Sequence, residues 1–209
     1  MNTLLHIIAT PRGADSRTLK VTAAFLEGFG KRHPGCRIDT LNLYDEELPA
    51  LTARQLDGKY VLLGGKDLTG ELENVWRGIL KQIERFLSAD AYLISAPMWN
   101  FSIPYALKHY IDVILQPKYL FRYTAEGPEG LVKGRKMAVI TSRGGDYGEG
   151  SPFRLYDFQE PYLKAVFGFA GITDITFINA QPMDALGPQV QAEKIASAQE
   201  TAKKAAEAF

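Results

Sequence analysis

The chain has 209 residues, 46% of them hydrophobic, so it is long enough to bury a sizeable core in a single domain over residues 1–209. Its 24 lysines and arginines balance 24 aspartates and glutamates, and this zero net charge argues against nucleic acid or an anionic membrane as the main partner. The one cysteine, Cys36, cannot form an internal disulfide, and no apolar stretch approaches the roughly 20 residues that span a bilayer. We therefore expect a cytoplasmic protein without a membrane partner.

Strand and helix signals alternate along the chain. Short apolar or alternating runs predict five strands, at residues 4–9, 37–43, 91–96, 136–141 and 175–180. Helical spacing and composition predict helices at residues 17–33, 53–62, 71–87, 103–116, 153–169 and 187–209. Ser102 is the predicted cap of the fourth helix, with Pro104 in its first turn, and Gly171 is the predicted C-cap of the fifth. The aromatic-rich segment 119–130 is interpreted as an insertion.

Five short apolar strands separated by helices predict an α/β fold with a parallel sheet covered by helices on both faces. Right-handed crossovers favour a doubly wound arrangement. Such sheets bind ligands at the carboxyl ends of their strands, where the strand order reverses. The loops after the first, third and fourth strands are also the most unusual stretches of the sequence, so we expect them to share one site.

The first loop, residues 10–18, is a strand-to-helix turn rich in hydroxyl groups. Free N–H groups at a helix N-terminus, together with the hydroxyls of Thr10, Ser16 and Thr18, are suited to a phosphate. The loop lacks the Gly-Lys-Ser/Thr of a P-loop and the Gly-x-Gly-x-x-Gly of a dinucleotide site. A cradle without lysine fits a phosphate that is held and not transferred, although ordinary helix capping by Ser16 and Asp15 explains the same residues equally well.

The second loop, residues 96–104, is stiffened by prolines and carries large side chains, in the order Pro97, Met98, Trp99, Asn100 and Phe101. Large apolar side chains after a strand would fit the edge and face of a flat ring. Packing onto the core or a subunit contact is the alternative for Trp99 and Phe101, but it leaves Asn100 unexplained.

The third loop contains Ser142, Arg143, Gly144 and Gly145. A glycine pair lets the backbone approach a ligand closely and donate N–H groups to it, although a flexible turn is the commoner use of such a pair. Together the three loops predict a phosphate at one end and a planar polar ring at the other. FMN fits that description.

Several motifs resemble the FMN-dependent NADH-azoreductases, which are also described as NADH:quinone oxidoreductases. They comprise residues 97–104, 107–108, 110–112, 121–124, 127–131, 141–145, 161–163, 167–169 and 171–172. The resemblance extends from the first strand to about residue 180. It implies a flavodoxin-like five-stranded parallel sheet of order 2-1-3-4-5, a homodimer, and one FMN per subunit near the dimer interface.

The resemblance also implies roles for individual residues. The phosphate of FMN would be held by Thr10, Ser16, Arg17 and Thr18. The isoalloxazine would be lined by Pro97, Met98, Trp99, Asn100 and Phe101 and by Ser142, Arg143, Gly144 and Gly145. The backbone N–H of Asn100 is expected at the reactive ring edge, and those of Gly144 and Gly145 at the pyrimidine side. No nucleophile is assigned, and three histidines and one cysteine show no metal-ligand spacing.

Enzymes of this kind work by a ping-pong mechanism, in which NADH or NADPH reduces the flavin and leaves before a quinone or azo compound takes two electrons. This chain has Trp99 where relatives usually have tyrosine, and it lacks the histidine that some carry shortly after the glycine pair. The alternative is a non-catalytic flavodoxin-like electron carrier or redox sensor, but the neutral charge, the aromatic walls and the 119–130 insertion favour an enzyme. Phe121, Tyr123, Phe153 and Phe167 are candidate walls of an acceptor pocket, with core packing as the alternative for them.

Overall fold

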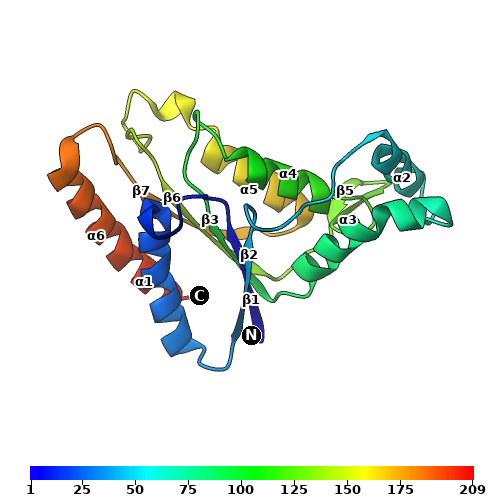
Figure 1. Cartoon of the computed structure of the whole chain (residues 1–209), viewed down its shortest axis with the longest axis horizontal. Helices are drawn as coiled ribbons and strands as arrows, with labels where there is room; N and C mark the ends of the chain where they lie inside the picture. Colours follow the sequence, from blue (N-terminus) through cyan, green and yellow to red (C-terminus); the bar gives the residue numbers. More distant parts are fainter.

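A five-stranded parallel sheet of order β2-β1-β3-β6-β7 forms the centre of the protein (Figure 1). It is seen in a computed structural model that describes residues 1–209. The strands are β1 (Thr3–Ile8), β2 (Arg37–Asn42), β3 (Ala91–Ser95), β6 (Lys136–Ser142) and β7 (Asp174–Ala180). All five predicted strands are confirmed, and counting only the strands of this sheet gives the predicted order 2-1-3-4-5.

Helices cover both faces of the sheet, as Figure 1 shows. One face carries α1 (Arg17–Arg32) and α6 (Gly187–Glu207), and the other carries α3 (Glu71–Leu87), α4 (Tyr105–Ile114) and α5 (Gln159–Ala170), while α2 (Ala53–Leu63) packs on α3. Successive residues of a strand point to opposite faces. Leu4 and Ile140 therefore belong to the core beneath α1 and α6, whereas their neighbours Leu5 and Val139 belong to the core on the other face. Burial on both faces explains why the central strands β1, β3 and β6 are mostly apolar, whereas the edge strands β2 and β7 are partly exposed.

The strand register brings the three predicted loops to one edge of the sheet. Ile8 is paired with Ser95, and Ser95 with Ile140, so β1, β3 and β6 end side by side. The backbone N–H of Met98 then donates to the carbonyl of Ser142 at 2.9 Å, which joins the second loop to the third. The expectation that these loops meet is confirmed.

The start of α4 differs from the prediction. Ser102 does not cap this helix: Pro104 is the N-cap and the helix runs from Tyr105 to Ile114. Ser102 instead exchanges two backbone hydrogen bonds with Trp99, at 2.9 and 3.0 Å. These bonds close a tight turn before the helix, so the cap is displaced toward the C-terminus.

The predicted helix at 153–169 is wrong at its beginning. A short 3₁₀ turn occupies Arg154–Tyr156, and α5 begins at Gln159. The Asp157 carboxylate accepts the N–H groups of Gln159 and Glu160, at 3.0 and 3.1 Å, which fixes the helix start. At the other end, Gly171 is the C-cap with a φ of 103°, as predicted.

The 119–130 segment forms an antiparallel hairpin, β4 (Phe121–Thr124) and β5 (Gly127–Gly130), that lies outside the main sheet. The sequence prediction assigned it no strands. Gly130 packs directly on the C-cap of α5, since a Cβ there would lie 2.3 Å from the backbone nitrogen of Gly171. No helix in the structure is both long and apolar enough to span a membrane.

Candidate functional site

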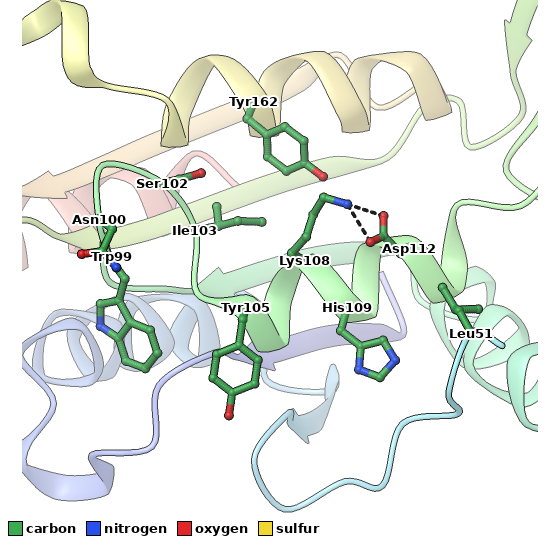
Figure 2. Close-up of a pocket in the computed structure, with 10 residues that line it drawn as sticks. All are labelled: Leu51, Trp99, Asn100, Ser102, Ile103, Tyr105, Lys108, His109, Asp112 and Tyr162. Carbon is green, nitrogen blue, oxygen red and sulfur yellow. Dashed lines mark hydrogen bonds and ion pairs between the residues drawn. The ribbon is translucent and has the colours of Figure 1, made fainter.

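Two adjoining cavities begin beside the loops that follow the central strands, and the second extends along α4. The first, which we call the loop cavity, has a volume of about 200 Å³ and is lined by Thr10, Arg12, Ser16, Arg17, Pro97, Met98, Trp99, Ser142, Arg143, Gly144, Met183 and Asp184. The second, the α4 cavity, has a volume of about 820 Å³ and is drawn in Figure 2. Trp99 lines both cavities, so they meet at this residue.

Hydroxyl groups and a helix N-terminus face the loop cavity. Ser16 is the N-cap of α1, and its Oγ accepts the N–H of Leu19 at 3.3 Å. The remaining N–H groups of the first turn have no acceptor within the helix. Ser16 therefore acts as a cap and still lines the cavity, so the two interpretations of this loop are compatible.

Thr18 does not line the loop cavity. Its side chain is fully buried, and its Oγ1 lies 2.7 Å from the Oγ of Ser142. The hydroxyl therefore connects α1 to the third loop, and a phosphate could meet only the backbone N–H of this residue.

The loop cavity is positively charged overall. Three arginines line it, but Arg143 is paired with Asp157 outside the lining. Arg12 and Arg17 contribute two positive charges and Asp184 one negative charge, which leaves one net positive charge. The Arg17 Nη1 pairs with the Asp184 Oδ1 at 2.6 Å. Asp184 and Met183 follow β7, and sequence reasoning missed both. The general tendency of ligands to bind beyond the carboxyl ends of parallel strands is the signal that could have found them.

Arg143 directs its charged group into the protein interior. Its side chain is only 1% exposed; the Nη1 pairs with Asp157 at 2.9 Å, and the Nε lies 3.1 Å from Thr141 Oγ1 and 3.2 Å from Gln159 Oε1. The guanidinium thus ties the third loop to the start of α5. The carbonyl of Gly144 accepts two further N–H groups, from Met183 and Asp184.

The turn between Trp99 and Ser102 is strained. Asn100 and Phe101 have φ angles of 47° and 70°, in the left-handed region that favours glycine. Such residues cost about 1–3 kcal/mol each and cluster at functional sites. The backbone N–H of Phe158 donates to the Phe101 carbonyl at 3.0 Å and helps to hold the turn, while the N–H of Asn100 makes no hydrogen bond within the chain.

Most of the predicted site residues meet at the two cavities. Nine line the loop cavity: Thr10, Ser16, Arg17, Pro97, Met98, Trp99, Ser142, Arg143 and Gly144. Asn100 lines the α4 cavity. Neither cavity is lined by Thr18, Phe101 or Gly145. The ring of Phe101 instead packs against the rings of Tyr147 and Tyr156.

The α4 cavity has walls that the sequence did not predict. Its lining residues are Leu51, Trp99, Asn100, Ser102, Ile103, Tyr105, Lys108, His109, Asp112 and Tyr162. None of the predicted acceptor walls is among them. Phe167 and Phe121 are buried in packing contacts, and Tyr123 and Phe153 are exposed at 65% and 56%.

A buried chain of polar side chains connects the sheet to α1. The Nε2 of His6 lies 2.9 Å from Ser95 Oγ, and this oxygen lies 2.7 Å from Thr22 Oγ1. Burial lowers the pKa of His6 from 6.5 to about 4, so the ring is neutral in the folded protein. His6 thus lies buried within β1.

This fold and this arrangement of loops define a flavodoxin-like protein. Residues 2–206 match the family model described as a flavodoxin-like fold. A relative from Nitratidesulfovibrio vulgaris (strain DP4), named FMN-dependent NADH:quinone oxidoreductase, is 39% identical over 209 residues, covering 100% of both chains. A relative of the same name from Clostridium perfringens (strain SM101 / Type A) is 41% identical over 210 residues, again covering 100% of both.

Solved structures agree with this assignment. An azoreductase from Bacillus anthracis str. Sterne superposes with a TM-score of 0.90 at 32% identity, covering 100% of both chains. An FMN-dependent NADH-azoreductase from Bacillus anthracis str. Ames Ancestor, solved in complex with FMN, superposes with a TM-score of 0.84 at 34% identity, covering 99% of this chain and 100% of that one. The chain belongs to the family of FMN-dependent NADH:quinone oxidoreductases and azoreductases.

Proposed function

We propose that the protein is an FMN-dependent oxidoreductase that uses NADH or NADPH to reduce quinones and azo compounds by two electrons in a ping-pong mechanism. Bound FMN supplies the redox chemistry, since it accepts a hydride and passes two electrons onward. The observation that carries this proposal is the junction of the two cavities at Trp99. One cavity has the chemistry of a phosphate site, and the other has the size of a ligand pocket.

The loop cavity fits the phosphate end of FMN. We infer that Arg12, Arg17, Thr10 and Ser16 hold the phosphate together with the first N–H groups of α1, including that of Thr18. The net positive charge of the lining supports an anionic ligand. The absence of lysine there fits a phosphate that is bound and not transferred.

The second and third loops would hold the ring. The turn from Pro97 through Phe101 offers the free N–H of Asn100, and its strained backbone is already set before a ligand binds. The N–H groups of Gly144 and Gly145 would donate to the carbonyl side of the ring. The side chain of Arg143 would act indirectly, because its bonds to Asp157 and Gln159 fix the third loop.

The α4 cavity would receive the nicotinamide and the acceptor in turn. It adjoins the second loop at Trp99 and Asn100, and its volume of about 820 Å³ is in the range of small-molecule pockets. Alternating use of one pocket by donor and acceptor is the structural counterpart of a ping-pong cycle.

We also propose a single FMN-binding domain over residues 1–209, a homodimer and a cytoplasmic location. Large aromatic side chains that are more than half exposed, such as Tyr105 and Tyr123, support a contact between subunits. The single free cysteine, Cys36, supports a reducing compartment.

The decisive experiment is a visible spectrum of the purified protein, recorded before and after NADH is added without oxygen, and again after a quinone is added. We expect a yellow protein that bleaches with NADH and recovers with the quinone. A colourless protein that neither binds added FMN nor oxidises NADH would contradict the proposal. A yellow protein that fails to bleach with NADH or NADPH would instead support an electron carrier.

A further inference from the structure

The α4 cavity has an aromatic end and a polar end. Trp99 and Tyr105 lie at the aromatic end, with ring centroids 6.4 Å apart. At the other end, Figure 2 shows the Tyr162 hydroxyl and the Lys108 ammonium group pointing toward the same space, with Asp112 beside Lys108. Tyr162 comes from α5, and the other two residues come from successive turns of α4. We call Lys108, Asp112 and Tyr162 the polar cluster.

The polar cluster offers hydrogen-bond donors but carries no net charge. The Lys108 Nζ lies 2.6 Å from both carboxylate oxygens of Asp112, so the two unit charges cancel. Burial and the charge of Asp112 raise the pKa of Tyr162 to about 12, so its hydroxyl stays protonated near neutral pH. This hydroxyl makes no hydrogen bond within the chain, and an ammonium group has three donors, not all of which Asp112 occupies.

We propose that Tyr162 and Lys108 bind a carbonyl oxygen of the electron acceptor, and that Asp112 makes the α4 cavity selective for uncharged quinones over anionic ones. The inference rests on the proposed function. It deepens that function by naming the favoured acceptor class, which is a flat ring with an uncharged oxygen at the end remote from Trp99.

Asp112 is the residue that sets this selectivity. A carbonyl oxygen accepts hydrogen bonds from the phenol and the ammonium group without disturbing the Lys108–Asp112 pair. A sulfonate or carboxylate in the same place would lie beside the Asp112 carboxylate, and like charges in a partly desolvated cavity repel. His109 also lines the cavity, but its Nε2 lies 3.0 Å from the Pro49 carbonyl.

The test compares naphthoquinone with naphthoquinone sulfonate on the FMN-loaded protein. Asp112→Asn leaves the Lys108 charge unbalanced, so we expect the ratio of kcat/KM for the sulfonate to that for the neutral quinone to rise about tenfold over the unmodified protein. Because each ratio uses the same two quinones, differences in their intrinsic reactivity cancel. The matched control is Glu27→Gln, which breaks a Lys–Glu pair of the same spacing and the same 2.6 Å separation on α1. We expect no change in the ratio for the control.

Binding without turnover gives a second readout. Calorimetric titration of each quinone into the oxidised protein gives its binding affinity. For Asp112→Asn we expect the ratio of the affinity for the sulfonate to that for the neutral quinone to rise by the same factor. Tyr162→Phe removes one donor, so we expect about fivefold weaker binding of the neutral quinone with unchanged FMN content. Equal ratios in the unmodified protein and Asp112→Asn, or unchanged quinone binding in Tyr162→Phe, would overturn the inference. Failure to oxidise NADH would contradict the proposed function alone, because the calorimetric comparison decides the acceptor class independently.

Discussion

The hydroxyl oxygens of Thr18 and Ser142 lie 2.7 Å apart, although 124 residues separate them in the sequence. Thr18 is in the first turn of α1, and Ser142 is the last residue of β6. Both residues are buried, so each hydroxyl depends on the other for a partner. This contact fixes the first loop, which follows β1, relative to the third loop, which follows β6, and both loops line the loop cavity.

Removing the Thr18 hydroxyl should destabilise the fold. Thr18→Val keeps the shape of the side chain but leaves the Ser142 hydroxyl buried without this partner, at a cost of about 1–3 kcal/mol. We expect the midpoint of urea unfolding, followed by circular dichroism, to fall accordingly. Thr18→Ser keeps the hydroxyl and serves as the control, so an equal loss of stability in the two variants would argue against the contact.

His6 should make the stability of the protein depend on pH. Its pKa is about 4 in the folded protein, against an ordinary value of 6.5 that applies when the chain is unfolded. Between these values the unfolded chain binds the extra proton, so the contribution is fully present above pH 6.5 and is lost as the pH falls toward 4. The expected loss is about 3 kcal/mol.

The measurement is the free energy of unfolding at a series of pH values in the unmodified protein and in His6→Gln. Other groups titrate in the same range, but they are common to both proteins and cancel in the difference. The difference curve should slope between pH 4 and pH 6.5 and be flat above. A flat difference throughout would show that His6 is protonated equally in the folded and unfolded states.

The sheet could be predicted because its central strands are buried on both faces and therefore consist mostly of apolar residues. Residues such as Leu4 and Leu5 are both fully buried, so the whole segment is apolar. The hairpin β4–β5 has no such signal, since Arg122 and Glu129 form an ion pair across its exposed surface. The hairpin depends on the close packing of Gly130 against the end of α5. This is a tertiary contact, which cannot be predicted from local strand propensity.

The part of the candidate site that lies at the ends of the strands could be predicted from the sequence. The loops after β1, β3 and β6 were recognised because such loops meet at one edge of a doubly wound sheet. The α4 cavity was not recognised, because Lys108 and Tyr162 belong to different helices that approach only in the folded protein. The burial of Thr18 depends on which side of α1 faces the sheet, and this could not be deduced from the residue type alone.

Arg143 should contribute mainly to stability. Arg143→Met removes one partner of a buried ion pair and leaves Asp157, whose side chain is 11% exposed, without its cation. Breaking a buried pair in this way costs about 3–5 kcal/mol. We expect a large decrease in the free energy of unfolding by urea. In a double-mutant cycle, the variant that carries both Arg143→Met and Asp157→Asn should be only slightly less stable than Arg143→Met alone. If the losses in the free energy of unfolding were additive, the two residues would act separately.

Asp184 should weaken the binding of FMN through its effect on Arg17. The Asp184 carboxylate pairs with Arg17 at 2.6 Å and cancels one of the two positive charges that Arg12 and Arg17 bring to the loop cavity. Asp184→Asn would therefore strengthen the attraction for a phosphate. We expect the dissociation constant for FMN to be roughly threefold to tenfold lower and to depend more steeply on salt concentration. The measurement is a fluorescence titration of the FMN-free protein at two salt concentrations. Asp67→Asn, which breaks an exposed pair with Lys118 at 2.9 Å, is the matched control and should leave the dissociation constant unchanged. Equal FMN affinity in Asp184→Asn and the unmodified protein would place the phosphate away from Arg17.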